Sequence, residues 1–598
     1  MKKIVLTLVT FITIASINAQ QDKRLKGIEK DLNEILEISK APGFAVAIVQ
    51  GDKVIYAKGF GYSDYENKIP VDANTMFAIG SSSKAFTSAI LGQLMAEDKI
   101  SFDESPIKYL PELKFYTNEM DNTIIIKDLM SHRTGLPRHD YSWYLFPTTN
   151  KDSLLARVAY HEPFTGVRQH WYYNNFMFLA QGVIAERMTG KSWEDNIKER
   201  FFVPLNMTRS NVSIDELQES TNIAKGYELK KDSIISKMDY YHISGMSPAG
   251  SINSTVNDMS NWLITWINKG KFKNNEILSE AYVNEAISSQ MIVDAALPEK
   301  EFPDVYMSNY GYGWFLSSYK GHYRVEHGGN IDGFSANVAF FPSDSIGVVV
   351  LSNQNGSPVP SLVRNMVADR MLNTQKTDWV KKFRDQKLKA KKTKEEAKAE
   401  TPKPVISKPS HNLQEYTGKY TNLGYGEFEI TNQNDSLFAN FKLKTLYLKH
   451  VHYDIFEPFE VVKNEIDTTD SGGLRLNFTT NDAGDIASVK MKIEPALEQS
   501  IEFKHTPNII DIDAATLDQY VGDYEFSGVP IKVYIKDENT LYLFVKGQPE
   551  YELLPTGKHK FSLKALEGFK LEFVTTDDTS INAVMMIQPN GTFKAIRK

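Results

Sequence analysis

A serine and a lysine three residues apart, Ser81 and Lys84, are the first residues whose types and spacing could do chemistry. They lie in FAIGSSSKAFTSAI, where an apolar helical pattern begins at Ala85. Residues three apart on a helix share a face, so Lys84 could take the proton of an attacking Ser81. A helix N-terminus also offers N–H groups and a positive dipole end to a developing oxyanion. The alternative is that Ser81 is only a helix cap.

The same spacing recurs at Ser317 and Lys320, in LSSYKG. This second copy lies in a strand-like run that leads to Gly321. On a strand, residues three apart point to opposite faces, so this pair cannot meet in the same way. We interpret the second copy as a coincidence of spacing.

A second candidate segment is Tyr173-Asn174-Asn175, just before a helical pattern over 178–189 that Gly190 would close. A tyrosine there could carry a proton, and Asn175 could bind a substrate amide. The same Y-x-N pattern occurs elsewhere in the chain, so it has little weight alone. The alternative is a turn with an asparagine cap.

A third candidate segment is His327-Gly328-Gly329, which follows one strand-like run (323–326) and precedes another (335–341). Glycines let a backbone approach a ligand closely, and an edge strand could offer its N–H and C=O groups to a substrate. The N–H of Asn330 could be a second oxyanion donor. The alternative is a glycine-rich hairpin turn with an ordinary histidine.

The elements that would position these residues interleave strands and helices. Runs 44–49 and 53–58 read as a hairpin around Gly51-Asp52, and runs 335–341 and 347–351 read as strands near the other end of this region. Helical patterns lie between them. This order predicts an α+β fold, with one sheet built from both ends of the region and a separate helical lobe.

Beyond this region the sequence repeats itself. LQEYTGKYTN begins at Leu413 and LDQYVGDYEF at Leu517, and short strand-like runs with Gly, Asn and Asp turns follow each. Each copy predicts a small antiparallel β-barrel, and two copies are too few for a solenoid. The motif tyrosines, which we expect in the barrel cores, are Tyr416, Tyr420, Tyr520 and Tyr524.

Composition excludes several classes of function. The 598 residues carry a net charge of −7, whereas nucleic-acid binders usually show a basic footprint. The chain has no cysteine, and its 12 histidines form no H-E-x-x-H pair. We therefore expect no nucleic-acid partner, no metal and no cofactor. The sequence leaves the oligomeric state open.

The N-terminus reads MKKIVLTLVTFITIASINAQQDK, with two lysines, a short apolar run and a plausible cleavage site after about Ala19. This pattern predicts a cleaved secretory signal peptide, so we expect a secreted or periplasmic protein. A membrane anchor is the alternative, but the run is short for a span of roughly 20 residues. After cleavage we expect no membrane-spanning segment.

Together, the ordered motifs S-x-x-K, Y-x-N and H-G-G resemble the serine β-lactamase and penicillin-recognising superfamily, on its class C side. DLMSHRTGLP (128–137), SPAGSINSTVNDM (247–259) and WEDNIKERFFVPLNM (193–207) also look like that group. The layout resembles D-aminopeptidases, in which two β-barrels follow the catalytic domain. The resulting division is a signal peptide (1–19), a catalytic domain (22–375), a charged, proline-containing linker (376–411) and lipocalin-like barrels (412–506 and 511–598).

The resemblance implies a mechanism through an acyl-enzyme. Ser81 would be the nucleophile, and Lys84 and Tyr173 would move its proton. Asn175 would position the substrate amide, and His327 would support the proton network.

The resemblance also implies which backbone groups would form the oxyanion hole. The N–H groups of Ser81 and Asn330 would bind the oxyanion, with Gly329 beside them.

One departure bears on the substrate. Class C β-lactamases usually carry K-T-G or K-S-G in the third motif, where this chain has His327 and Gly328. Losing the lysine and the hydroxyl removes partners of a substrate carboxylate, worth roughly 1.5–3 kcal/mol. We therefore expect a hydrolase of small peptides, amides or esters. The alternatives are a β-lactamase or DD-peptidase, and a catalytically silent cell-wall-binding protein.

Overall fold

The computed structural model describes residues 22–294, 297–298, 306–399, 407–462, 465–467, 472–537, 539–566, 568–576 and 580–598. The predicted signal peptide (1–19) lies outside these residues. The chain divides into two compact units. The first contains residues 1–101, 188–243 and 247–394, and the second contains 102–187, 244–246 and 395–598.

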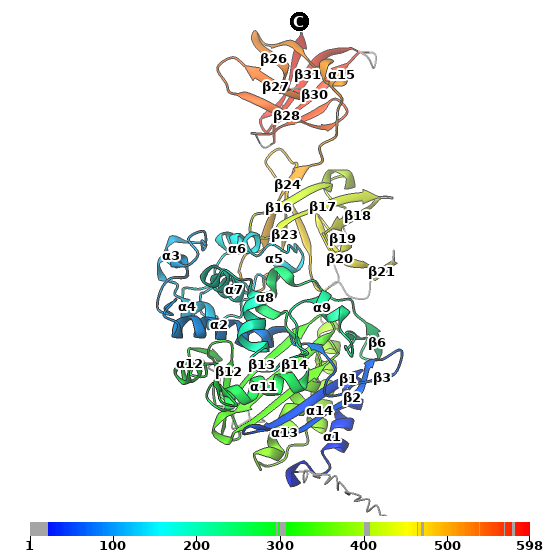
Figure 1. Cartoon of the computed structure of the whole chain (residues 1–598). Coiled ribbons are helices and arrows are strands. Elements are labelled where there is room, and N and C mark those ends of the chain that lie inside the picture. Colours follow the sequence, from blue (N-terminus) through cyan, green and yellow to red (C-terminus); the bar gives the residue numbers. More distant parts are fainter. Residues whose placement is uncertain are drawn as a thin grey trace, which may run out of the picture. The chain divides into compact units, whose positions relative to one another are not determined.

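A nine-stranded antiparallel sheet forms the centre of the first unit, in the order β10-β11-β12-β13-β14-β15-β1-β2-β3. Strand β1 from one chain end pairs with β15 from the other, with Val46 opposite Val350. Figure 1 shows the blue strands β1 and β2 in the same sheet as the green strands β13 and β14. This confirms the expected α+β sheet built from both ends of the region. The strands are β1 (Gly43–Gln50), β2 (Lys53–Asp64), β3 (Ile69–Pro70), β10 (Met291–Asp294), β11 (Ser308–Tyr310), β12 (Phe315–Tyr319), β13 (His322–Ile331), β14 (Phe334–Phe341) and β15 (Ile346–Ser352).

Helices cover both faces of this sheet. Alternate residues of β1, such as Phe44 and Val46, pack in one cluster with α1 (Ile28–Ser39) and α13 (Val359–Met371). Ala45 and Ala47 point to the other face and are equally buried. Aromatic rings of α11 (Val256–Ile267) pack against the sheet there, including Trp266 against Phe340. Burial on both faces explains why β1 is apolar without a break.

Shorter elements complete the first unit. The strand pairs are β4 (Phe77–Ala78) with β7 (Asn253–Ser254), β5 (Tyr227–Lys230) with β6 (Ile234–Lys237), and β8 (Lys271–Phe272) with β9 (Asn275–Glu276). The helices are α2 (Lys84–Ala96), α8 (Trp193–Ile197), α9 (Ile214–Glu219), α10 (Ser247–Gly250) and α12 (Glu280–Ala286). The polar segment after the sheet is helical, as α14 (Trp379–Ala399).

The second unit begins with a helical lobe. Its helices are α3 (Asn118–Thr123), α4 (Ile126–Met130), α5 (Asp140–Tyr144), α6 (Lys151–Leu155) and α7 (Phe176–Thr189). Helix α7 begins at Phe176, two residues before the expected start, and ends at Thr189, directly before Gly190 with φ +68°. None of the helices in the described part of the chain is long and apolar enough to span a membrane.

Two barrels of eight strands follow, which confirms the expected C-terminal architecture. The first barrel closes between β19 and β20. Its strands are β16 (Gly418–Asn422), β17 (Gly426–Gln433), β18 (Ser436–Asn440), β19 (Thr445–His452), β20 (Ile455–Val462), β22 (Leu476–Thr480), β23 (Ile486–Met491) and β24 (Ile501–Pro507), with β21 (Glu465–Asp467) beside β20.

The second barrel is closed in chain order, after the short helix α15 (Ala514–Asp518). Its strands are β25 (Gly522–Phe526), β26 (Val529–Lys536), β27 (Thr540–Val545), β28 (Glu550–Gly557), β29 (Lys560–Leu563), β30 (Lys570–Thr575), β31 (Ile581–Gln588) and β32 (Gly591–Arg597).

The repeated tyrosine motif has the same structural role in both barrels. The Tyr420 hydroxyl donates to the Tyr416 carbonyl at 2.8 Å, and the Tyr524 hydroxyl donates to the Tyr520 carbonyl at 2.9 Å. All four rings are buried. The motif therefore fixes the turn that enters each barrel, and its tyrosines are core residues as expected.

Candidate active site

Ser81 and Lys84 meet at the start of helix α2. Gly80–Ser83 form one turn of 3₁₀ helix, which continues into α2. The Lys84 Nζ donates to the Ser81 Oγ at 3.1 Å and to the Ala249 carbonyl at 2.7 Å, and Lys84 is fully buried. The predicted neighbours are thus in hydrogen-bond contact, as a nucleophile and its base must be.

The neighbouring serines make different contacts. The Ser82 Oγ donates to the His327 carbonyl at 3.0 Å, and the Ser83 Oγ donates to the Gly80 carbonyl at 2.7 Å. No serine side chain caps either helical segment here. The alternative that Ser81 is a helix cap is therefore wrong. Ser82 and Ser83 hold the turn in place, while the Ser81 hydroxyl contacts Lys84.

His327-Gly328-Gly329 lies inside strand β13, which corrects the expectation that it stands between two strands. The hairpin turn comes later, at Asp332-Gly333, where Gly333 has φ +84°. Strand β12 pairs with β13 only as far as Glu326, so the following residues pair with β14 alone. This stretch is an open edge, and the alternative of a glycine-rich turn is wrong.

The open edge of β13 lies directly against the turn that carries Ser81. A Cβ on Gly329 would stand 1.8 Å from the Ile79 carbonyl oxygen and 3.1 Å from the Ser81 nitrogen. A Cβ on Gly80 would stand 3.0 Å from the Asn330 nitrogen. Only glycine fits at position 329, because any side chain would collide with this backbone. The two predicted oxyanion donors, Ser81 N–H and Asn330 N–H, therefore belong to segments in direct contact.

His327 is buried and neutral. Burial, together with the nearby Lys84 ammonium, lowers the pKa of the imidazole to about 3. Its Nδ1 lies 2.6 Å from the Gly328 carbonyl, which can only accept, so the proton is on Nδ1. Its Nε2 then accepts from the Tyr310 hydroxyl at 2.9 Å. A neutral imidazole therefore occupies the motif position at which class C β-lactamases usually carry a lysine.

Tyr310 was not predicted from the sequence. It lies on β11 and reaches His327 only because the sheet places β11 and β13 on either side of β12. Nothing in its local sequence, SNYGYGW, indicates this contact.

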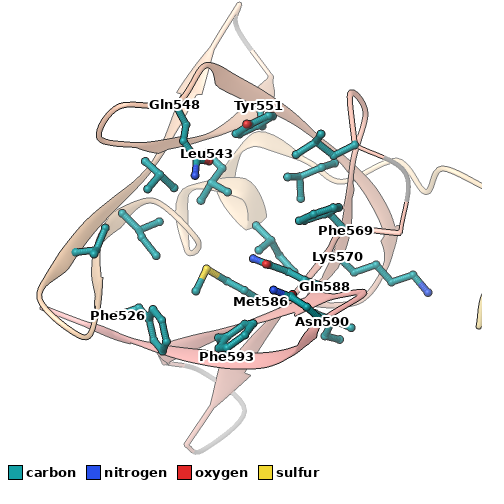
Figure 2. Close-up of a pocket in the computed structure, with 17 residues that line it drawn as sticks. Phe526, Leu543, Gln548, Tyr551, Phe569, Lys570, Met586, Gln588, Asn590 and Phe593 are labelled. Carbon is teal, nitrogen blue, oxygen red and sulfur yellow. The ribbon is translucent and has the colours of Figure 1, made fainter. Parts of the chain in front are cut away.

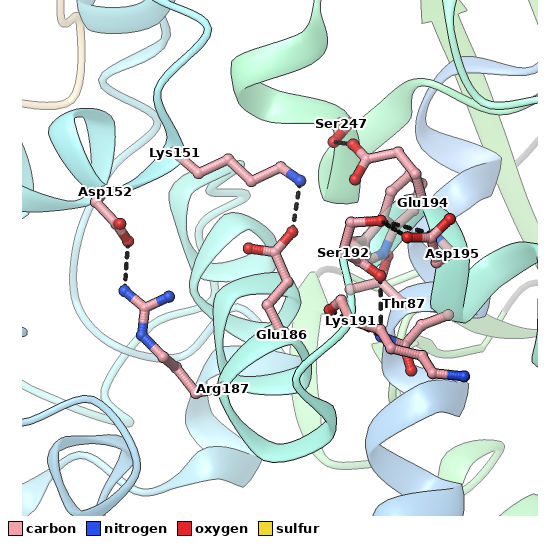
Figure 3. A network of polar contacts seen from close by, with 12 residues as sticks. Thr87, Lys151, Asp152, Glu186, Arg187, Lys191, Ser192, Glu194, Asp195 and Ser247 are labelled. Atoms are coloured by element: carbon pink, nitrogen blue, oxygen red, sulfur yellow. Dashed lines mark hydrogen bonds and ion pairs between the residues drawn. The ribbon is translucent and has the colours of Figure 1, made fainter.

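Helix α8 contacts helix α2, which carries Lys84, and helix α10, which carries the Lys84 acceptor Ala249. Figure 3 shows the Glu194 side chain of α8 beside Ser247 of α10. The Trp193 Nε1 donates to the Thr87 Oγ1 of α2 at 3.0 Å. The Ser247 Oγ of α10 donates to Glu194 at 2.5 Å, and α10 contains Ala249, the acceptor of Lys84. The segments 193–197 (WEDNI) and 247–250 (SPAG) thus help to position Lys84.

Tyr173 and Asn175 belong to the second unit. The Tyr173 ring packs against the His132 ring, with centroids 4.4 Å apart, and the Arg138 guanidinium lies 4.7 Å from its centroid. The Asn175 Nδ2 donates to Asp140 at 2.8 Å. The sequence also allowed this triplet to be a turn with an asparagine cap. An asparagine does cap helix α7, but it is Asn174, whose Oδ1 accepts from the Met177 N–H.

The segment DLMSHRTGLP supports this tyrosine. The Asp128 carboxylate is fully buried and forms ion pairs with Arg133 at 2.6 Å and with Arg168 at 2.7 Å. The Nδ1 of His132 accepts from the backbone N–H of Asn174 at 3.1 Å. His132 and Arg138 both contact Tyr173. Sequence reasoning did not single them out, because the motif does not indicate which of its side chains touches Tyr173.

The helix that follows Tyr173 is tied to α6 within the lobe (Figure 3). Lys151 pairs with Glu186 at 2.6 Å, and Arg187 pairs with Asp152 at 2.9 Å.

In the described part of the chain, no group of three or more His, Cys, Asp and Glu side chains could hold a metal ion.

Comparison with known proteins agrees with the motifs. A model of the family described as Beta-lactamase matches residues 28–370, which is more than half of the chain. The chain belongs to this family. A domain of unknown function, DUF3471, matches residues 402–505 of the same β-lactamase-related chain, over the first barrel.

Curated relatives include hydrolases. Unguisins hydrolase ungD of Aspergillus violaceofuscus is 26% identical over 432 residues, covering 67% of this chain and 76% of the relative. Protein flp of Staphylococcus aureus is 27% identical over 357 residues, covering 58% of this chain and 66% of the relative.

A solved structure shares the fold. The octameric penicillin-binding protein homologue from Pyrococcus abyssi superimposes with a TM-score of 0.54 at 20% identity, covering 80% of this chain and all of that chain. This structure supports the β-lactamase-type fold, and the family match identifies the chain as a member of a β-lactamase-fold serine hydrolase family.

Proposed function

We propose that this chain is an exported serine hydrolase that cleaves small peptides, amides or esters through an acyl-enzyme on Ser81. The 3.1 Å hydrogen bond between the Lys84 Nζ and the Ser81 Oγ carries the proposal, because it joins a nucleophile to a base at a helix N-terminus. The relative named a hydrolase supports hydrolysis as the reaction class.

The reaction would run in two balanced steps. Lys84 first gives up its ammonium proton to solvent; the Ser81 Oγ then attacks the carbonyl carbon while the unprotonated Lys84 takes its proton, and the N–H groups of Ser81 and Asn330 bind the oxyanion. The bond to the amine or alcohol then breaks, and the leaving group takes the proton. Water hydrolyses the ester on Ser81 by the reverse proton path. Tyr173 sharing this proton transfer, and Asn175 positioning the substrate amide, are further parts of the proposal.

The neutral His327 and the absence of a side chain at Gly328 support substrates that lack a carboxylate beside the scissile bond. A carboxylate beside the scissile bond would find neither the ammonium nor the hydroxyl of K-T-G there. Substrates without that carboxylate lose nothing, which favours amino-terminal amides and esters over penicillins and stem peptides.

Labelling with a fluorophosphonate, followed by mass spectrometry of the intact protein, tests the nucleophile. Wild type should gain one label, and Ser81→Ala should gain none. The matched control is Ser317→Ala, from the second S-x-x-K copy, which should label like wild type. Equal labelling of wild type and Ser81→Ala would exclude Ser81 and leave the silent binding protein as the better hypothesis.

Turnover of three probes tests the substrate class. We expect hydrolysis of a D-amino-acid amide and of a p-nitrophenyl ester to exceed that of nitrocefin. Faster nitrocefin turnover would point to a β-lactamase instead. Export is tested separately by the mass of the mature protein, which should begin near residue 20.

A further inference from the structure

The second barrel contains an apolar cavity that the catalytic chemistry does not use. Its volume is about 300 Å³, at the lower end of the range of roughly 300–1,000 Å³ for ligand pockets. Apolar side chains from several strands point into it, with Met586 near the centre (Figure 2). Phe526, Leu543 and Phe593 also line it.

The cavity occupies only part of the barrel interior. Elsewhere the interior is filled with aromatic rings, where Tyr520 packs against Phe561 and Phe573 at centroid distances of 5.0 and 4.7 Å. A barrel of eight strands is just wide enough for its own side chains to fill. The cavity in the second barrel is therefore explained by the size of the side chains at its end of the barrel.

Strand register identifies the equivalent end of the first barrel. Tyr420 pairs with Phe428 as Tyr524 pairs with Ile531, so Ile531 is the counterpart of Phe428. By the same registers Val545 corresponds to Phe441, and Ala595 to Phe503. Three phenylalanines in the first barrel are thus three smaller residues in the second, and two of these, Ile531 and Val545, line the cavity.

The first barrel also receives a side chain from outside it. Phe146 of the helical lobe packs against Phe441 at 5.5 Å and Phe503 at 5.7 Å, and it is 5% exposed. Gly426 makes room, since a Cβ there would stand 2.9 Å from the Phe146 ring. The end of helix α5 and the residue after it, Leu145 and Phe146, therefore plug the end of the first barrel.

The rim of the cavity is polar and neutral. Gln548, Gln588 and Asn590 line it, and primary amides both donate and accept, as a peptide backbone requires. The one lysine in the lining, Lys570, points away from the cavity in Figure 2. Its ammonium pairs with Asp485. An occupant with an uncharged polar part and a large apolar group fits this chemistry.

We propose that the cavity of the β25–β32 barrel binds an uncharged peptide segment of another protein, which inserts a large apolar side chain. The segment does in the second barrel what Leu145-Phe146 does in the first. This activity is independent of Ser81, so it stands whether or not the hydrolase proposal holds.

Binding of a synthetic peptide to the full chain tests this. The probe is the dye-labelled, end-capped hexapeptide WYLFPT, which copies residues 143–148, measured by fluorescence anisotropy. Val545→Phe and Met586→Phe each place a ring in the cavity and should weaken binding at least about tenfold, because the phenyl group loses its burial. Phe544→Val, at the neighbouring exposed position, should bind like wild type.

Two further comparisons make the result decisive. WYLAPT should bind at least about tenfold more weakly than WYLFPT, since it lacks the inserted ring. Unfolding transitions of all variants show whether each one folds, and the two filling variants lie on different strands. No peptide binding, or equal binding to wild type and both filling variants, overturns the proposal. Binding of uncharged N-phenyl-1-naphthylamine alone, lost in the filling variants, also overturns it in favour of a small apolar molecule.

Discussion

At the scale of single residues, the two glycines of H-G-G have different reasons to be there. A Cβ on Gly329 would collide with the Ile79 carbonyl at 1.8 Å, whereas a Cβ on Gly328 would meet its nearest atom, the Ala336 oxygen, at 3.6 Å. Packing therefore requires glycine at 329 and permits a side chain at 328. Steric exclusion therefore does not explain why position 328 lacks the serine or threonine hydroxyl of K-S-G and K-T-G. A preference for substrates without a carboxylate at that place is consistent with its loss.

Substitution of Gly328 should shift substrate preference. Gly328→Ser restores the hydroxyl, which can hydrogen-bond a substrate carboxylate for roughly 1.5–3 kcal/mol. We expect kcat/KM for substrates with a carboxylate beside the scissile bond to rise about 10- to 100-fold, with little change for p-nitrophenyl esters. The contrasting variant, Gly329→Ala, should lose activity on both. A Gly328→Ser enzyme with unchanged preference would show that this position does not face the substrate carboxylate.

At the scale of elements, the contact between the helical lobe and the first barrel includes two buried histidines. His139 and His161 stack with ring centroids 4.3 Å apart. The His139 Nδ1 lies 2.8 Å from the Tyr425 hydroxyl, and the His161 Nε2 donates to the Gly424 carbonyl at 2.8 Å. Burial lowers the pKa of His139 to about 4 and that of His161 well below its usual range.

This pair should make the second unit sensitive to acid. Each imidazole has a lower pKa in the folded state than in the unfolded state, where it is about 6.5. Above pH 6.5 neither state is protonated. As the pH falls towards 4, the unfolded state gains protons first and stability falls, by up to about 1.4 kcal/mol per pH unit for each histidine.

Denaturant unfolding at pH 7.5, 6 and 5 measures this effect. The variant with His139→Gln and His161→Gln should show a flatter dependence on pH than wild type, although it is less stable at pH 7.5. Burial raises the pKa of Glu494 nearby, which acts in the opposite direction, but this carboxyl is present in both proteins. His170→Asn, on the surface, is the matched control. Parallel wild-type and double-variant curves would contradict the assignment.

Phe146 is the other element of this contact. Phe146→Ala should destabilise the second unit by about 3–5 kcal/mol, because it removes a buried ring and leaves a cavity at the end of the first barrel. Chemical denaturation followed by circular dichroism measures the change. Phe438→Ala, a half-buried ring outside the barrel core, should cost far less. Similar losses in both variants would mean that Phe146 is no plug.

At the scale of the whole molecule, sequence patterns predicted what depends on local spacing. The pair Ser81 and Lys84, the hairpin of β1 and β2, and both barrels follow from periodicity and repeats. Tyr310 and Phe146 could not be found in this way, because each acquires its role from a strand or barrel distant in sequence. His327 was found, but its place inside β13 was missed because Gly328 and Gly329 resemble a turn.

The contact between lobe and first barrel also predicts how the chain can be shortened. Leu145 and Phe146 share one apolar cluster with Tyr425 and Phe428, and the Ser142 hydroxyl donates to the Gly424 carbonyl at 2.7 Å. Removing the first barrel would expose this surface of the lobe to water. The second barrel has its own closed sheet and its own core cluster.

We therefore expect two truncations to behave differently. A chain of residues 20–509, which keeps the first barrel, should fold and take up the fluorophosphonate label like the full chain. A chain of residues 20–399 should melt at a lower temperature or aggregate, because the face around Phe146 has lost its partner. Phe146→Ser within the shorter chain should reduce aggregation, since it removes the largest exposed ring. If the 20–399 chain melts at the temperature of the 20–509 chain, the first barrel adds nothing to the stability of the lobe, and the contact through Phe146 is a consequence of folding rather than a condition for it.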